Sequence, residues 1–344
     1  MEKAILNAWP SVVVGDRNQW QSKLTLELTG LPEEIRFRAL PDNAGTNTGL
    51  KPAHAAGFAA GLSALCKDAH RYRFTLQGVD LVMAEDDIVV ADGLIKLVRV
   101  HPGRHTGPGN MSESLPQIHL DIFTEYPLPE QGDKLAVDIQ QTPGLPATVT
   151  FSFSRKPLRD LLGGVRIGID PGHGGKDKGI QGPVDLTEKY VALEISRELC
   201  NLLELSGAHL VVTRTGDLDV TEKERLHILR AGNPALCVEI HVSGSDNPLA
   251  QVYKLAATQD CSDSQLLGRE IALALHERMG IRPESAVLPP RPGLEVPYVR
   301  VEPLCLTYFA DEANFRAPLF RKRLAQSIYN GISRYLHKTK VRQS

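Results

Sequence analysis

Four ionisable side chains are of the types, and in the places, that metal-assisted hydrolysis requires. They are His173, Glu188, His241 and Glu302. Three of them stand at or just past the end of a strand-like run, and Glu188 stands at the expected start of a helix. Two histidines and one carboxylate leave the fourth tetrahedral position of a zinc ion open, as in catalytic rather than structural sites. The remaining glutamate could supply the proton transfer that amide hydrolysis needs.

His173 lies within a glycine-rich turn. Residues 170–175 read Asp-Pro-Gly-His-Gly-Gly and directly follow the apolar run 165–169. The glycines allow a sharp turn and a close approach of the backbone to a ligand. A phosphate-binding loop is the rival interpretation, but the segment lacks the Lys-Ser/Thr ending of a P-loop and the spacing of a dinucleotide fingerprint. The sequence therefore favours a metal ligand at His173.

Glu188 has two interpretations, which this residue taken alone leaves equal. It comes three residues after Asp185, a spacing typical of a capping box at a helix start. Steps of three and four from Glu188 reach Val191, Ile195 and Leu199, so the carboxylate falls on the core-facing stripe of the helix. A buried carboxylate needs a partner, because leaving it unpaired is costly. Either a helix cap or a metal ion could provide that partner.

His241 closes the strand-like run 236–241. Strand alternation places Glu239 and His241 on one face and Ile240 on the other. A single histidine at a strand end is more often structural than a ligand. The presence of His173 and Glu188 reverses that preference and favours a shared metal ion.

Glu302 ends the run 296–302, and the Pro303 that follows halts strand pairing. Zinc lowers the pKa of bound water towards about 7. A base must still accept the proton of that water, and an acid must return one to the leaving amine. Glu302 is the candidate for both steps.

The helices and strands expected from the sequence fall into two groups, which predict two domains, residues 1–160 and 165–344. The first part is expected to be a β-rich domain, because short alternating or β-branched runs recur between turn residues. One helix is expected near residues 52–66, and residues 101–114 are expected to form an exposed loop. The expected strands are residues 23–28, 34–38, 87–90, 95–100, 117–122 and 148–153.

The second part alternates strands with helices. This pattern predicts an α/β fold with a mostly parallel sheet flanked by helices. Ligands in such folds collect beyond the carboxyl ends of the strands, where the proposed site residues stand. The expected strands are residues 165–169, 209–213, 236–242 and 296–302, and the expected helices are residues 186–205, 221–230, 264–279 and 319–336.

The composition gives no sign of a nucleic-acid-binding protein, a membrane-spanning protein or a metal site built from cysteines. A chain of 344 residues has room for two domains, and its formal net charge of −2 gives no sign of a nucleic-acid partner. No run approaches the ~18 uninterrupted apolar residues of a membrane span, and the amino-terminal residues lack the layout of a secretory signal. The five cysteines form no Cys-x-x-Cys pair, so buried free thiols are expected and metal ligands must be His and carboxylate.

The C-terminal part resembles the zinc-dependent N-acetylmuramoyl-L-alanine amidases of type 3, which cleave peptidoglycan between N-acetylmuramic acid and L-alanine. Residues 170–175 resemble the first zinc motif of that family, and residues 186–189 resemble the helix start with its second ligand. Residues 239–242 resemble the Ser-Ile-His-Ala-Asn stretch with the third ligand. Residues 297–302, Pro-Tyr-Val-Arg-Val-Glu, resemble a Pro-Ala-Val-Leu-Val-Glu pattern that ends in the catalytic glutamate. The segment 213–217 and Arg225 resemble a further family segment.

This resemblance implies a hydrolase that uses Zn²⁺, with His173, Glu188 and His241 as ligands and Glu302 as the catalytic residue. It implies peptidoglycan as the partner, through both glycan strand and stem peptide. It also implies a location in the cell wall or otherwise outside the cytoplasm. A monomer without a membrane span is expected.

The chain departs from the family pattern close to the site. Glu239 stands where the family usually has Ser, Ser243 stands where it usually has Asn, and residues 304–305 replace Gly-Phe. These changes bear on substrate fit rather than on zinc. Because Glu239 is one alternation away from His241, we expect its carboxylate to hydrogen-bond the imidazole of a ligand.

A second alignment with the family pattern, in a different register, would put Tyr308 at the catalytic position, since residues 303–308 also begin with the required proline. That register needs a gap of several residues before the last helix, whereas the register with Glu302 runs on without one. Glu302 is therefore preferred.

Other functions stay open. The altered residues around His241 and Glu302 would suit a catalytically silent, zinc-containing protein that binds peptidoglycan. A zinc peptidase of another specificity would cleave peptide bonds and leave the lactyl amide intact. The first 160 residues carry no motif that we can assign to chemistry, so wall binding, targeting and scaffolding are all open for them.

Overall fold

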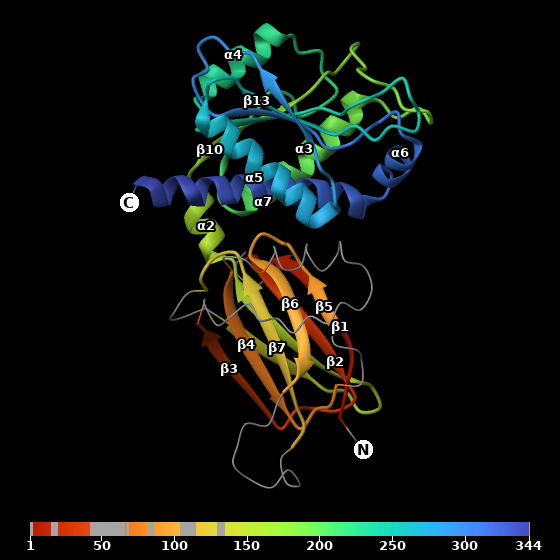
Figure 1. The fold of residues 1–344 in the computed structure, drawn as a ribbon, viewed down its shortest axis with the longest axis vertical. Coiled ribbons are helices and arrows are strands. Elements are labelled where there is room, and N and C mark those ends of the chain that lie inside the picture. The colour runs from red at the N-terminus through yellow and green to blue at the C-terminus, as the bar shows by residue number, and fades with distance from the viewer. Residues whose placement is uncertain are drawn as a thin grey trace. The chain divides into compact units, whose positions relative to one another are not determined.

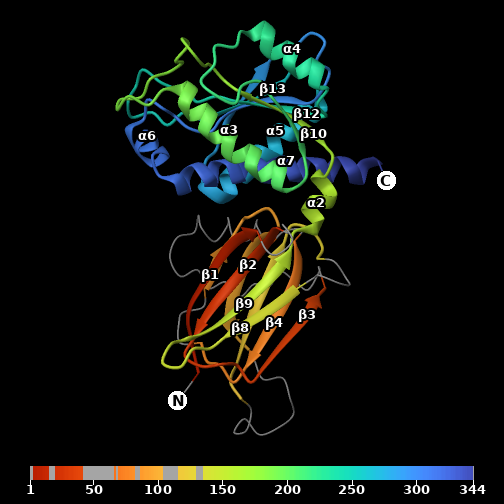
Figure 2. The ribbon, with the colours of Figure 1, turned by 180° about the vertical axis from the view of Figure 1, so that it is seen from behind.

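The computed structural model describes residues 3–14, 20–41, 66, 69–81, 86–103, 115–128 and 135–343. The chain forms two compact units, Met1–Pro157 and Leu158–Ser344. Figure 1 shows strands in the first unit and a sheet with helices in the second, and Figure 2 shows both from behind. The helix expected near residues 52–66 lies outside the described residues except at Cys66, and so does the expected loop beyond residue 103.

Two antiparallel sheets make up the described part of the first unit. One has the order β1-β2-β9-β8 and the other the order β3-β4-β7-β6-β5. The ring centroids of Phe74 on β4 and Phe151 on β9 lie 4.3 Å apart, so the two sheets pack through their inner faces. The strands are β1 (Ile5–Val14), β2 (Trp20–Leu28), β3 (Glu34–Leu40), β4 (His70–Gln77), β5 (Asp86–Val89), β6 (Ile95–Pro102), β7 (Gln117–Thr124), β8 (Leu135–Gln140) and β9 (Ala147–Ser154).

All six strands expected in this unit are present, and three more were missed. Alternate residues of β2 are buried, as its sequence pattern predicts. The missed strand β1 contains Pro10, which favours an edge position, and β1 lies at the edge of its sheet. The missed strand β8 is also an edge strand, and most of its side chains are exposed. Strand β4 was missed because Arg71 and Arg73 make the alternation of apolar and polar residues in its sequence hard to recognise.

The second unit is built on one six-stranded sheet with the order β11-β10-β12-β15-β13-β14. The first four of these strands run parallel, β13 runs antiparallel to β15, and β14 runs parallel to β13. The expectation of a mostly parallel sheet is therefore confirmed, with one antiparallel pair. The strands are β10 (Arg166–Pro171), β11 (His209–Val212), β12 (Leu236–Ile240), β13 (Lys254–Thr258), β14 (Glu284–Leu288) and β15 (Tyr298–Glu302).

Helices cover both faces of this sheet. Figures 1 and 2 both show α4 on one side and α3, α5 and α7 on the other. Every residue of the central strand β12 is buried, which explains its nearly continuous apolar sequence. The helices are α2 (Lys156–Leu162), α3 (Glu188–Leu205), α4 (Glu222–Gly232), α5 (Ser262–Met279), α6 (Phe309–Phe315) and α7 (Pro318–Gln343).

All five cysteines are free, as expected, but only Cys237 and Cys305 are buried, whereas Cys66, Cys200 and Cys261 are partly exposed. Within the described ranges, no helix is both long and apolar enough to cross a membrane.

We expect a fragment of residues 156–344 to fold alone and to bind zinc. It contains α2 and the whole six-stranded sheet, and it leaves out Arg155, whose guanidinium contacts Ser22 and lies over the ring of Trp20 in the first unit. Denaturant unfolding should give a single cooperative transition, and metal analysis should find zinc at the level of the full chain. Loss of cooperative unfolding would mean that the two units share one core.

Candidate active site

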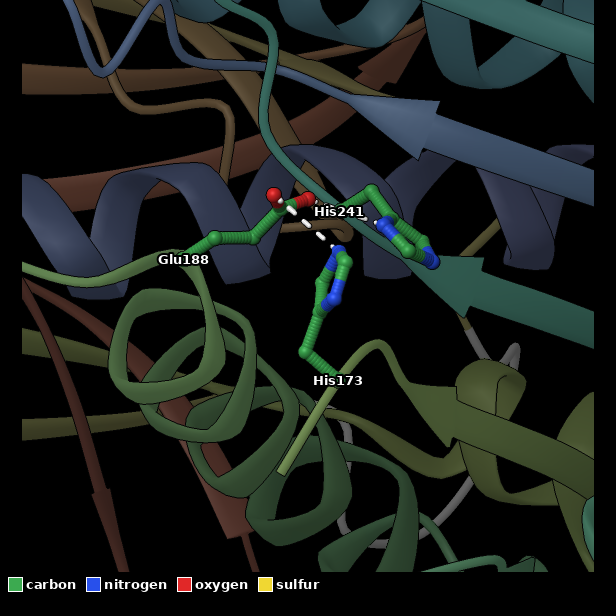
Figure 3. Close-up of side chains that lie close together, drawn as sticks. All are labelled: His173, Glu188 and His241. Carbon is green, nitrogen blue, oxygen red and sulfur yellow. Dashed lines mark hydrogen bonds and ion pairs between the residues drawn. The ribbon is translucent and has the colours of Figure 1, made fainter. Parts of the chain in front are cut away.

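His173, Glu188 and His241 converge, one from each of three separate elements. Figure 3 shows the two imidazoles pointing toward the Glu188 carboxylate. His173 Nε2 lies 3.1 Å from Glu188 Oε2, and His241 Nδ1 lies 2.8 Å from Glu188 Oε1. One potential ligand atom from each residue falls within 4.8 Å of the other two, as a shared metal ion requires. No other such group of His, Cys, Asp and Glu occurs among the residues that the structure describes.

The turn after β10 presents His173. This residue has a φ of 58°, in the left-handed region, and glycines stand on both sides of it. The buried guanidinium of Arg225 donates to the carbonyl oxygen of His173 and to the carboxylate of Asp170, which stabilises the turn from behind. His173 Nδ1 lies 2.8 Å from Asp177 Oδ2, so the second nitrogen of the ring also faces a carboxylate.

Glu188 is the first residue of α3, but it is not the partner in a capping box. The N-cap is Thr187, whose side chain makes no capping bond, and Asp185 accepts a hydrogen bond from Gln181 instead. The expected capping spacing was therefore wrong. Asp185 has a φ of 67°, which takes the chain out of the conformation that a capping box needs.

The Glu188 carboxylate, only 3% exposed, is instead the hub of the cluster. Its oxygens accept hydrogen bonds from the backbone N–H groups of Ile180 and Val242 at 2.9 and 3.1 Å, in addition to their imidazole contacts. Burial alone would raise the pKa of Glu188, but the hydrogen bonds from the two histidines and the backbone hold that pKa well below its usual range. Glu188 is therefore a fixed negative charge at neutral pH.

His241 follows the last residue of β12 and lies between two carboxylates. Its Nδ1 faces Glu188, and its Nε2 lies 3.1 Å from Glu239 Oε1. Burial alone would lower the pKa of His241, but the two carboxylates raise that pKa to about 9. In both histidines one nitrogen faces Glu188 while the other is held by a second carboxylate. Metal-binding histidines commonly have this arrangement, so the donor set fits a metal ion.

Glu239 contacts the ring as the sequence predicted, and its other partners were not foreseen. Arg300, Arg291 and the hydroxyl group of Tyr298 all donate to its carboxylate. Arg291 comes from the loop before β15, and no local pattern marks it. Arg300 and Tyr298 lie on the same face of β15, and the parallel register of β12 and β15 places Arg300 beside Glu239. That register could have revealed the pair.

Glu302 ends β15 at the edge of the sheet where the cluster lies. Ile240 pairs with Val301, and the backbone N–H of His241 donates to the carbonyl oxygen of Val301 at 3.0 Å, so His241 and Glu302 end neighbouring strands. Ser243 Oγ donates to Glu302 Oε2 at 3.0 Å. The rival candidate, Tyr308, is the N-cap residue of α6.

A pocket of about 310 Å³ lies against both histidines. Its lining includes His173 and His241, the acidic side chains Asp177 and Glu239, and the partly exposed guanidinium of Arg300. The site is therefore open to a ligand on one side.

Replacing Glu188 by Ala should remove the bound metal, because its carboxylate contacts both imidazoles. A lost helix cap alone would cost about 0.5–2 kcal/mol of stability and leave the metal in place. Glu224→Ala is the matched control, since Glu224 forms a true capping box with Thr221 at the start of α4. Metal analysis and denaturant unfolding of both variants separate the two roles. Full zinc occupancy in Glu188→Ala would rule out Glu188 as a ligand.

The affinity for zinc should keep rising with pH up to about 9, the value to which the pKa of His241 is raised. Zinc binds neutral imidazole, so a bound proton competes with the ion until the pH passes the pKa of the ligand. An ordinary histidine, with a pKa of about 6.5, would give a plateau near neutral pH. Competition with a chelator of known affinity between pH 6 and 9.5 measures the profile. A plateau reached by pH 7 would contradict the raised pKa.

Comparison with known proteins identifies the domain that carries this site. Residues 167–334 match the family model described as N-acetylmuramoyl-L-alanine amidase. The amidase LytC of Bacillus subtilis is 28% identical over 183 residues, which make up 52% of this chain and 37% of LytC. The amidase AmiC of Neisseria meningitidis is 28% identical over 217 residues, which make up 49% of this chain and 52% of AmiC. The chain thus spans about half, or less, of the length of these relatives.

Among solved structures, the amidase AmiC2 of Nostoc punctiforme is 28% identical in sequence and gives a TM-score of 0.45, over 50% of this chain and 97% of that one. The matched range contains the positions of His173, Glu188, His241 and Glu302. By the family model alone, residues 167–334 match the N-acetylmuramoyl-L-alanine amidase family.

Proposed function

We propose that the second unit is a zinc-dependent hydrolase that cleaves the amide bond between N-acetylmuramic acid and L-alanine in peptidoglycan. The observation that carries this proposal is the convergence of His173, Glu188 and His241 within the residues that match the amidase family model. The partner of the protein is then peptidoglycan. The protein would act on it as a monomer, in the cell wall or elsewhere outside the cytoplasm. The first unit would bind or target the wall.

His173, Glu188 and His241 would hold the ion. Bound zinc lowers the pKa of water to about 7 and polarises a carbonyl oxygen. The low pKa of Glu188 keeps its carboxylate ionised for this role. Asp177 and Glu239 each accept a hydrogen bond from one imidazole, which fixes the orientation of both rings.

Glu302 would move the proton. It would accept a proton from the attacking water and deliver it to the departing alanine nitrogen, so that one side chain serves as base and then as acid. The hydrogen bond from Ser243 orients the Glu302 carboxylate through Oε2 and leaves Oε1 for the transferred proton.

Digestion of purified peptidoglycan with the full chain tests this proposal. We expect soluble stem peptides with a free alanine amino group, together with glycan strands whose reducing ends are unchanged. A chelator should stop the release, and added zinc should restore it. Binding without release would favour the silent binding protein. Peptide fragments with the lactyl amide intact would favour a peptidase.

A further inference from the structure

Two residues of β15, Tyr298 and Arg300, both contact the carboxylate of Glu239 on β12. Glu239 stands in place of Ser, and Tyr298 and Arg300 stand in place of Ala and Leu in the pattern that ends at Glu302. Arg300 Nη2 lies 2.9 Å from Glu239 Oε1, and Tyr298 Oη lies 3.1 Å from Glu239 Oε2. Tyr298 and Arg300 thus meet at a carboxylate that also contacts His241.

Both oxygens of Glu239 have fixed partners. Oε1 accepts from Arg300 and faces His241 Nε2, while Oε2 accepts from Tyr298 and from Arg291 at 3.0 Å. The guanidinium of Arg291 also lies 4.5 Å above the centre of the Tyr298 ring and pairs with Glu222 at the start of α4. The Glu239 side chain therefore has little freedom to turn away from the imidazole.

Burial makes the charges of this group depend on one another. The Glu239 side chain is only 4% exposed, and Arg291 and Arg300 are 13% and 31% exposed. A carboxylate buried to this degree stays ionised only if cations or donors surround it, and Arg300 and Arg291 supply them. A charged Glu239 accepts a stronger hydrogen bond from His241 than the usual serine could.

We propose that Arg300 and Tyr298 are positioning residues that hold Glu239 against His241 Nε2, and so orient the imidazole for its role as a metal ligand. With Nε2 committed to Glu239, Nδ1 is the nitrogen left facing Glu188. Arg300 acts on the metal only through Glu239. This inference rests on the metal site of the proposed function and assigns a role to two residues that are not among the proposed metal ligands.

The test is a double-substitution cycle in the full chain, measured as the zinc dissociation constant in competition with a chelator. Arg300→Leu and Glu239→Ser each install the residue of the family pattern. Loss of a group that orients a metal ligand typically weakens metal binding about 10–100-fold, and we expect at least about tenfold for each variant. Because Arg300 acts through Glu239, adding Arg300→Leu to Glu239→Ser should weaken binding no further.

Glu270→Gln is the matched control for lost stability. Glu270 is also a buried carboxylate, 1% exposed and 2.8 Å from Lys338 Nζ, but it lies on α5 and contacts neither histidine. We expect it to lower the unfolding midpoint of the metal-free protein while its zinc affinity stays within about twofold of wild type. A readout of metal affinity thus separates positioning from general destabilisation.

If the wild type binds zinc and the zinc affinity is unchanged in Arg300→Leu and Glu239→Ser, this inference is wrong and the proposed function still stands. The inference is also wrong if the loss of zinc affinity in the double variant equals the product of the losses in the two single variants, because Arg300 would then act by a route other than Glu239. Absence of zinc binding by the wild type is a failure of the proposed function itself.

Discussion

His173→Ala and His241→Ala should each largely abolish zinc binding by a protein that otherwise carries about one zinc per chain. Three protein side chains hold a catalytic zinc, and two rarely retain it against a chelator. In this chain the loss is reinforced, because either substitution also removes one of the two imidazoles that keep Glu188 ionised. Metal analysis of the purified variants, after dialysis against a chelator, gives the zinc content directly.

His227→Ala is the control for these variants, since His227 is an exposed histidine on α4. It should keep the zinc content of the wild type. Full occupancy in the double variant His173→Ala/His241→Ala would show that the ion, if present, is held elsewhere.

Glu302→Gln should lower amidase turnover by about 10²–10⁴, the usual contribution of a general acid–base group, with zinc content unchanged. The amide keeps the size of the side chain and can still accept the hydrogen bond from Ser243 Oγ. It cannot accept a proton from water, so the substitution isolates proton transfer from folding and from metal binding. Initial rates on purified peptidoglycan, normalised to zinc content, measure the effect.

Tyr308→Phe distinguishes the two registers of the active-site strand. Because Tyr308 begins α6 whereas Glu302 ends β15 beside the strand of His241, we expect Tyr308→Phe to retain most of the activity. Near wild-type turnover in Glu302→Gln, together with loss in Tyr308→Phe, would show that the assignment of the catalytic residue is wrong. Unchanged turnover in both would point to a different base.

The parts of the fold that follow strong local patterns could be predicted from the sequence. The buried strands β10 and β12 are short apolar runs, and α3 carries a regular apolar stripe, so all three were found. Strands β13 and β14 were missed. The first reads Lys-Leu-Ala-Ala-Thr, with little β-branched character, and four of the five residues of the second are exposed. Their place in the sheet is set by tertiary pairing.

The site residues could be named because each stands at the end of an element, and such ends meet at one edge of a parallel sheet. The contacts between them could not be derived in the same way. Asp177 and Arg291 lie in irregular segments, and only the folded chain brings them to His173 and Glu239. The expected cap at Glu188 failed for a related reason, since the backbone at Asp185 takes a left-handed conformation that its sequence does not reveal.

Hydrolysis of a purified muropeptide in water labelled with a heavy oxygen isotope shows which bond the chain cleaves. If the chain cleaves the amide between N-acetylmuramic acid and L-alanine, mass spectrometry will find one heavy oxygen in the lactyl carboxyl group and an unlabelled stem peptide with a free amino terminus. The reaction should require zinc and should be about 10²–10⁴-fold slower in Glu302→Gln. Label found in peptide fragments, with the lactyl amide intact, would contradict the proposed function.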